Sequence, residues 1–94
     1  MSDFSNLNHL SPEIKLLIVN GQSVIEKAYE TLADRNCKFD LTSKRQLKGD
    51  CRKVEKCIER LANGKVTEKT VKELEHAVVA LQTTYTGLVA FFSR

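Results

Sequence analysis

Apolar residues recur at alternating intervals of three and four positions along the last third of the chain. This stripe consists of Val71, Leu74, Val78, Leu81, Tyr85, Leu88 and Phe92. Because an α-helix turns once every ~3.6 residues, these side chains share one face of a helix. The pattern predicts a helix over about 68–92 that begins at an N-cap on Thr67. Four neighbouring apolar residues widen the stripe enough to contact two other helices: Ala77, Ala80, Val89 and Phe91.

A similar stripe covers the first third of the chain. Its members are Ile14, Leu17, Ile18, Gly21, Val24, Ile25, Ala28, Tyr29 and Leu32. Ser11 and Pro12 immediately precede it and have the form of a helix start, a capping hydroxyl followed by proline at the first helical position. The predicted helix covers about 12–35. Gly21 lies on its apolar face, where glycine marks either a close helix contact or a bend.

The middle stripe repeats the same spacing. It consists of Leu47, Cys51, Val54, Ile58 and Leu61. It predicts a helix over about 43–62 that stops at Gly64, with Asp40, Thr42 and Ser43 as competing caps. Gly49 lies near the start of this segment and leaves open a division into two helices.

Three helical stripes without any strand-like alternation predict an all-α fold, an antiparallel three- to four-helix bundle. We expect one domain over residues 1–94, with residues 1–10 as a flexible leader. The residues expected to form the core are the stripe of the last helix together with Ile14, Leu17, Val24, Ile25, Leu32, Leu47, Val54, Ile58 and Leu61.

The composition is that of an ordinary globular protein. Of the 94 residues, 41% are hydrophobic and 29% are charged, too apolar for disorder and too interrupted by charge for a membrane span. The N-terminal residues lack the pattern of a secretory signal, so the expected location is the cytoplasm. Three cysteines, an odd number, favour free thiols over a disulfide framework.

The residues that could carry chemistry are few. Cys51 and Cys57 are six positions apart and diverge by about 240° on a helix, which disfavours a metal pair. His9 lies in the polar leader, and His76 lies off the apolar stripe beside two glutamates. No glycine-rich phosphate loop or metalloprotease motif is present. The sequence therefore predicts neither an enzyme nor a cofactor or metal site.

The strongest charge pattern is a basic row in the middle helix. Lys44, Lys48, Arg52 and Lys56 recur every four residues and form a candidate partner-binding face. Residues 42–66 contain eight bases and three acids. Such a face suits an acidic protein partner, or nucleic acid phosphates with strong salt dependence. Nucleic acid is the less favoured partner, because no arginine-rich arm, helix-turn-helix spacing or exposed aromatic pair accompanies the row.

One family resemblance covers about four-fifths of the chain. The segment "NGQSVIEKAYETLADRNCKFDLTSKRQLKGDCRKVEKCIERLANGKVTEKTVKELEHAVVALQTTYTGLVAFF" resembles the C-terminal helical lid subdomain of the seventy-kilodalton heat-shock chaperones. The likeness lies in the order and spacing of the helices. It implies a helical lid that closes over a substrate-binding domain and modulates how long clients stay bound.

The function expected from the sequence is therefore a non-enzymatic helical protein-interaction domain, most specifically a lid-like chaperone module. One alternative is a small stand-alone regulator or inhibitor that masks a protein partner. A second alternative is a weak nucleic-acid binder that uses the basic middle helix. The apolar C-terminal end, with Val89, Phe91 and Phe92, also allows a homodimer through the last helix.

Overall fold

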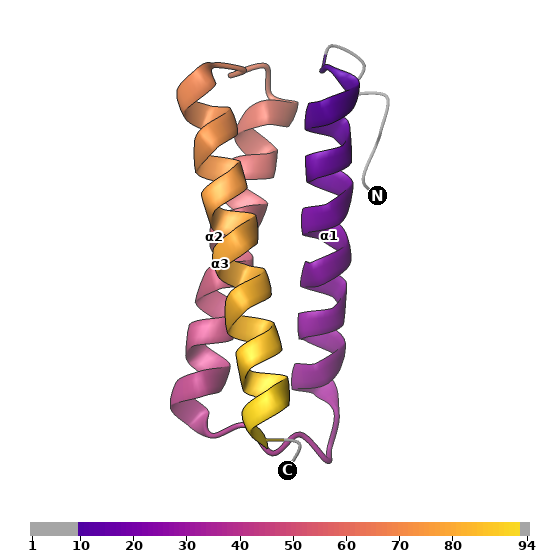
Figure 1. Cartoon of the computed structure of the whole chain (residues 1–94), viewed down its shortest axis with the longest axis vertical. Helices are drawn as coiled ribbons and strands as arrows, with labels where there is room; N and C mark the ends of the chain where they lie inside the picture. Colours follow the sequence, from indigo (N-terminus) through magenta and orange to yellow (C-terminus); the bar gives the residue numbers. More distant parts are fainter. Residues whose placement is uncertain (1–9, 93–94) are drawn as a thin grey trace.

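The protein is a bundle of three helices, and the computed structural model describes residues 10–92 (Figure 1). Helix α1 spans Pro12–Ala33, α2 spans Leu41–Ala62 and α3 spans Glu68–Phe92. No strand occurs in this range, which confirms the all-α prediction. Gly49 lies inside the unbroken α2, so the helix count over residues 10–92 is three and not four.

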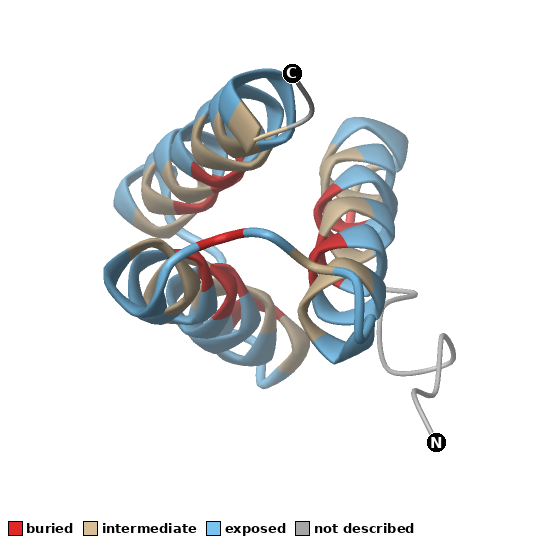
Figure 2. Cartoon of the chain, turned by 90° about the horizontal axis from the view of Figure 1, so that it is seen from below, coloured by how far each residue is buried: buried red, intermediate tan, exposed pale blue. Residues whose placement is uncertain are grey.

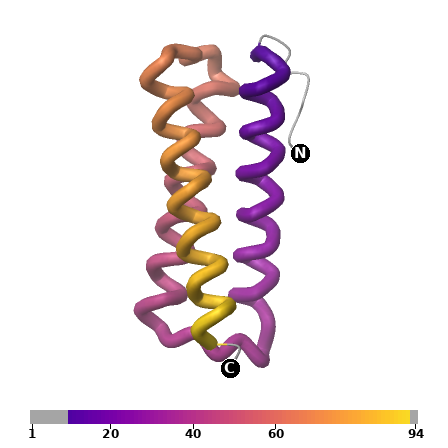
Figure 3. Tube along the Cα trace, in the orientation of Figure 1, coloured from indigo at the N-terminus to yellow at the C-terminus, as the bar shows by residue number. Residues whose placement is uncertain are grey.

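The path of the chain sets the direction of each helix. The trace passes along α1, returns along α2 and follows α3 in the direction of α1 (Figure 3). Both α1 and α3 are therefore antiparallel to α2, as short connections favour. The expected flexible leader lies outside the described residues except for Leu10.

The first and last helices begin at the caps that the sequence predicts. Ser11 Oγ accepts a hydrogen bond from the backbone N–H of Ile14 at 3.3 Å, and Pro12 occupies the first helical position. Thr67 Oγ1 accepts a hydrogen bond from the backbone N–H of Thr70 at 3.1 Å. Each cap pairs an amide that the first turn would otherwise leave without a partner.

The boundaries around the first loop differ from the prediction. α1 ends at Ala33, earlier than expected, and α2 begins at Leu41 because Asp40 is its N-cap. The Asp40 carboxylate accepts a hydrogen bond from the backbone N–H of Ser43 at 2.7 Å, and this bond lowers the pKa of Asp40. An anionic acceptor at a helix N-terminus makes a stronger hydrogen bond than a hydroxyl does. Asp40 is therefore the cap among the three candidates.

The three apolar stripes meet in one core, with the buried parts of each ribbon turned toward the bundle axis (Figure 2). The largest completely buried side chains are Ile18, Leu47, Leu61, Leu74, Leu81, Val54 and Cys51. Every residue predicted for the core is either buried or packed against the buried cluster. Burial of each large apolar side chain contributes about 1.5–3 kcal/mol.

Two residues outside the helices close the ends of the core. Leu10, which the sequence assigned to the leader, is only 5% exposed at the start of α1. Phe39, in the loop before α2, is 8% exposed, and its ring centroid lies 5.4 Å from that of Phe92. Helical periodicity predicts neither contact because neither residue belongs to a helix.

Two glycines have distinct structural roles. Gly64 has a φ of 94° after the end of α2, a conformation that glycine adopts without the clash of a side chain. Gly21 is buried, and a Cβ added there would lie 3.1 Å from a methyl carbon of Val54 and 3.1 Å from one of Val78. Gly21 thus marks a close contact of α1 with both other helices, one of the two roles that the sequence left open.

Side-chain hydrogen bonds also connect α2 to both neighbours. The Thr84 hydroxyl of α3 donates to an oxygen of Asp50 at 2.7 Å. The Tyr29 hydroxyl of α1 donates to an oxygen of Glu55 at 3.2 Å. Tyr29 is 38% exposed, so this residue of the predicted apolar face lies at its edge, where its hydroxyl reaches a partner.

The predicted widening of the α3 stripe is wrong for three residues. Ala80, Val89 and Phe91 are exposed, and Phe91 is exposed to 67%. Phe92 instead packs on Phe39 inside the same molecule. Val89 and Phe91 diverge by about 200° on the helix and do not form one apolar patch. A homodimer through α3 stays a prediction. Phe92 is already packed within its own molecule and is not available as a contact of such a dimer.

Candidate interaction site

The predicted row of four bases does not follow a single line on α2. Positions four apart shift by about 40° around a helix, so three such steps shift the row by about 120°. Lys44, at one end, is partly buried, whereas Lys48, Arg52 and Lys56 are exposed. Arg52 lies toward α1, where its charge opposes the rise that burial and Glu55 cause in the pKa of Tyr29. Lys56, at the other end, lines a groove toward α3.

A broader set of bases covers the outward side of α2. We call this set the basic face, and it consists of Arg45, Arg52, Lys53, Lys56 and Arg60. All five are exposed and fall within a sector of about 100° around the helix. Asp50 lies outside this sector, bonded to Thr84 of α3, and Glu59 borders it.

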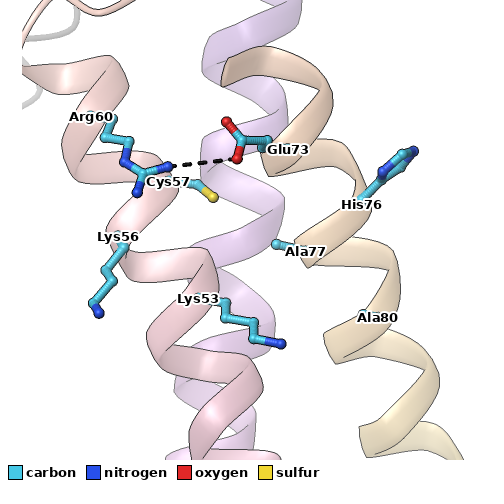
Figure 4. A pocket seen from close by; sticks show the side chains of 8 residues that line it. All are labelled: Lys53, Lys56, Cys57, Arg60, Glu73, His76, Ala77 and Ala80. Atoms are coloured by element: carbon cyan, nitrogen blue, oxygen red, sulfur yellow. Dashed lines mark ion pairs between the residues drawn. The ribbon is translucent and has the colours of Figure 1, made fainter. Parts of the chain in front are cut away.

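A groove of about 450 Å³ lies between α2 and α3 at one edge of the basic face. We call it the α2–α3 groove. Its lining residues are Lys53, Lys56, Cys57, Arg60, Glu73, His76, Ala77 and Ala80. Figure 4 shows Lys53 extending from α2 toward α3, whereas the His76 ring points away from α2.

Short side chains account for the hollow. Ala77 and Ala80 on α3 and Cys57 on α2 occupy positions where a leucine would fill the space between the helices. Cys57 and Ala77 are half-buried, and Ala80 is exposed. The floor of the groove is therefore small and apolar, and longer charged side chains rise around it.

The charges on the groove are predominantly positive. Three cationic side chains from α2 face one carboxylate, that of Glu73 on α3. Arg60 and Glu73 form an ion pair with an N–O distance of 3.7 Å, and both side chains are about half exposed, at 50% and 43%. Solvent screening leaves such a pair weak, so it is exchangeable for an incoming carboxylate.

The two thiols of α2 are poorly suited to nucleophilic chemistry. Burial, with Glu55 and Asp50 nearby, raises the pKa of Cys51 to about 11. Burial and the Glu73 charge also raise the pKa of Cys57, against a smaller opposing effect of Arg60. Since the thiolate is the reactive form, both thiols are weak nucleophiles near neutral pH.

A second hollow, between α1 and α3, has the opposite charge. Its lining residues are Ser11, Glu13, Ile14, Leu17, Val71 and Glu75. Two carboxylates thus flank an apolar floor, with no base among the lining residues. The bundle therefore presents an acidic hollow beside α1 and a basic groove beside α2.

Sequence reasoning found part of this site. It named Lys56 and Arg52 but not Lys53, Arg60 or the contribution of α3. The row with four-residue spacing contains bases that lie on several sides of α2. The groove depends instead on the rotation of α2 and α3 about their own axes, which spacing in the sequence does not give. The small residues at positions 77 and 80 are the available signal, although apolar spacing alone places them in the widened stripe of the last helix.

Comparisons with known proteins identify no relative: no family model, curated protein or solved structure matches the chain.

The described helices include none whose length and apolarity would let it cross a bilayer. Over residues 10–92, no three histidine, cysteine, aspartate or glutamate side chains gather as a group able to hold a metal ion.

Proposed function

We propose that the protein is a non-enzymatic helical domain that acts through contacts with another protein. The observation that carries this proposal is the junction of the basic face with the α2–α3 groove. A basic face alone attracts any polyanion, but an adjoining apolar hollow favours a partner that also presents apolar side chains. Protein segments combine these two properties in one surface.

The finer form of the proposal is a lid-like module that modulates how long a chaperone client stays bound. Its support is the order and spacing of three helices, the features on which the resemblance rests. The reading frame of the gene tests it directly. A lid requires a substrate-binding β-domain and an ATPase encoded upstream of the bundle, and a reading frame that starts at Met1 and stops after Arg94 would remove it.

A stand-alone regulator or inhibitor that masks a partner is the alternative within the same class. Leu10 and Phe39 close the two ends of the core, so residues of this chain itself cover both ends of the bundle interior. A location in the cytoplasm remains part of both proposals.

Site-specific crosslinking tests whether this face contacts a protein. A photo-reactive amino acid replaces Lys56 at the groove in one variant and Lys27, an exposed lysine of α1, in the other. In a lysate of the source cells, we expect a discrete protein adduct from position 56 and none from position 27. Equal adducts at both positions, or none at position 56, would contradict the proposal. A nuclease-sensitive adduct would favour the nucleic-acid alternative.

A further inference from the structure

The α2–α3 groove has the dimensions of a short helix contact. Lys53 and Arg60, at its two ends on α2, are separated by about two helical turns, or roughly 10 Å along the axis. Glu73 and Ala80 mark the same length on α3. Two adjacent helices with small residues between them leave space for a third helix to pack across both at an interaxial distance of about 8–10 Å.

We propose that the groove binds an acidic amphipathic helix of a protein partner, which would complete a local four-helix arrangement. This inference rests on the proposed function and specifies the partner's chemistry. A seam of small or medium apolar residues contacts Cys57, Ala77 and Ala80. Carboxylates on the flank of the same helix pair with the bases of α2.

The bases of the groove are available for such pairs. Over the described residues, neither Lys53 nor Lys56 has an ion-pair partner, and both are exposed. Arg60 is engaged only by the screened contact with Glu73. An incoming carboxylate can therefore pair with either lysine without displacing an existing bond, and with Arg60 by exchange.

The apolar floor distinguishes this partner from a nucleic acid. A phosphate backbone would neutralise the same bases but would leave Ala77 and Ala80 without an apolar contact. The groove also lacks the tryptophan, tyrosine and phenylalanine side chains on which single-stranded bases stack, and the ring of its His76 points away from α2 (Figure 4). A helix with an apolar seam covers the floor and meets the charges at once.

A synthetic peptide provides the probe. It is a fluorescent helix of about four turns with alanine and leucine at one seam, glutamates on both flanks and a hydrocarbon staple on its outer face, because short free helices are marginal in water. One control peptide carries lysines in place of the glutamates. Another carries serines in place of the seam residues. An oligodeoxythymidylate strand of similar net charge represents nucleic acid.

Fluorescence anisotropy at about 0.15 M ionic strength measures binding of each probe to the intact protein. We expect the acidic seam peptide to bind at least tenfold more tightly than the serine-seam peptide, the lysine peptide or the DNA. Equal binding of the serine-seam peptide, or of the DNA, would show that charge alone governs the surface and would overturn the proposal.

Paired variants locate the site. Lys53→Glu with Lys56→Glu replaces two attractions by repulsions and should weaken binding of the acidic peptide about tenfold. The matched control is Lys44→Glu with Lys48→Glu, which makes the same charge change on the same helix outside the groove. Equal loss in both pairs would contradict the proposed position.

A neutral substitution tests the floor separately from charge. Ala80→Gln fills part of the groove at an exposed position and should weaken binding about tenfold, whereas Ala90→Gln, also exposed on α3, should leave it unchanged. Circular dichroism establishes that each variant is folded. If the acidic peptide fails to bind while position 56 still crosslinks to a protein, the partner helix is wrong and the proposed function stands.

Discussion

Small residues have opposite consequences at two places in this bundle. At Gly21, inside the core, the missing side chain lets α1 approach until an added Cβ would lie 3.1 Å from methyl groups of both other helices. At Ala77 and Ala80, between the outer sides of α2 and α3, short side chains leave a groove of about 450 Å³. A small side-chain volume thus allows a close helix contact in the core and leaves an unfilled groove at the surface.

The difference lies in what surrounds each small residue. Around Gly21, the large residues of two stripes supply the packing, so that the backbone can move inward until the space is filled. Around Ala80, the long side chains that line the groove are polar or charged and extend into water, and no large apolar side chain fills the space. A small residue on a core face therefore brings helices together, whereas one at a solvent-facing junction leaves a site for a partner.

Two adjacent residues of α3, one on the core face and one in the groove, should differ most in their effect on stability. Leu81 is completely buried, and Ala80 lines the groove. Leu81→Asp removes core packing worth about 2–5 kcal/mol and buries an unpaired charge, which together consume most of the ~5–14 kcal/mol expected for a chain of this size. We expect no cooperative thermal transition by circular dichroism at 222 nm.

The control is Ala80→Asp, which introduces the same side chain one position earlier. At an exposed site its cost should be about 0.5 kcal/mol of helix propensity, with a cooperative transition retained. If Leu81→Asp melted like the parent, the assignment of this helix face to the core would be wrong.

The helices themselves could be predicted because their signals are local. The stripe of α3 fixed its buried face, and the caps at Ser11 and Thr67 fixed two helix starts. Spacing alone could not decide the third start, because Asp40, Thr42 and Ser43 are all capping residues, and the structure shows Asp40 as the cap. Leu10 and Phe39 lie beyond the reach of periodicity, since tertiary contacts alone place them in the core.

The groove could be predicted only in part, for a geometrical reason. A sequence gives the angle of each residue around its own helix but not the rotation of that helix against its neighbours. Lys53 and Ala80 become neighbours of one groove only once both rotations are fixed. The basic row was recognised from spacing alone, and the 40° drift per step carried its members to different sides of α2.

A second test compares two glycines for their effect on stability. Gly21→Ala places a methyl group 3.1 Å from Val54 and from Val78, so overpacking of about 1–3 kcal/mol should outweigh the gain of about 1 kcal/mol in helix propensity. The expected result is a loss of about 1 kcal/mol in the free energy of unfolding, measured by urea titration.

Gly49→Ala is the matched control, because nothing lies within 4 Å of a Cβ added there. It should stabilise the protein by about 0.5–1 kcal/mol through helix propensity alone. Stabilisation of the same size in both variants would mean that α1 is not held close at Gly21. If Val54→Ala costs less stability in the Gly21→Ala protein than in the parent, the side chain of Val54 is a source of the clash.

The smallest effect on stability should come from Glu73→Gln at the groove. The Arg60–Glu73 pair has an N–O distance of 3.7 Å between half-exposed side chains, so its loss should change the free energy of unfolding by less than about 0.5 kcal/mol. Removal of the groove's one carboxylate should nevertheless strengthen binding of the acidic peptide about threefold, because Arg60 is released and a repulsion disappears.

Glu75→Gln makes the same change in net charge two residues away, in the hollow beside α1, and should alter peptide binding little. Long-range attraction would respond to either substitution, whereas contact within the groove responds only to the loss of Glu73. Weaker peptide binding in Glu73→Gln would mean that the ion pair holds Arg60 in the position that binding needs, and does not compete with the peptide for Arg60. In that case the partner would have to donate to Glu73, and the acidic helix would be the wrong occupant.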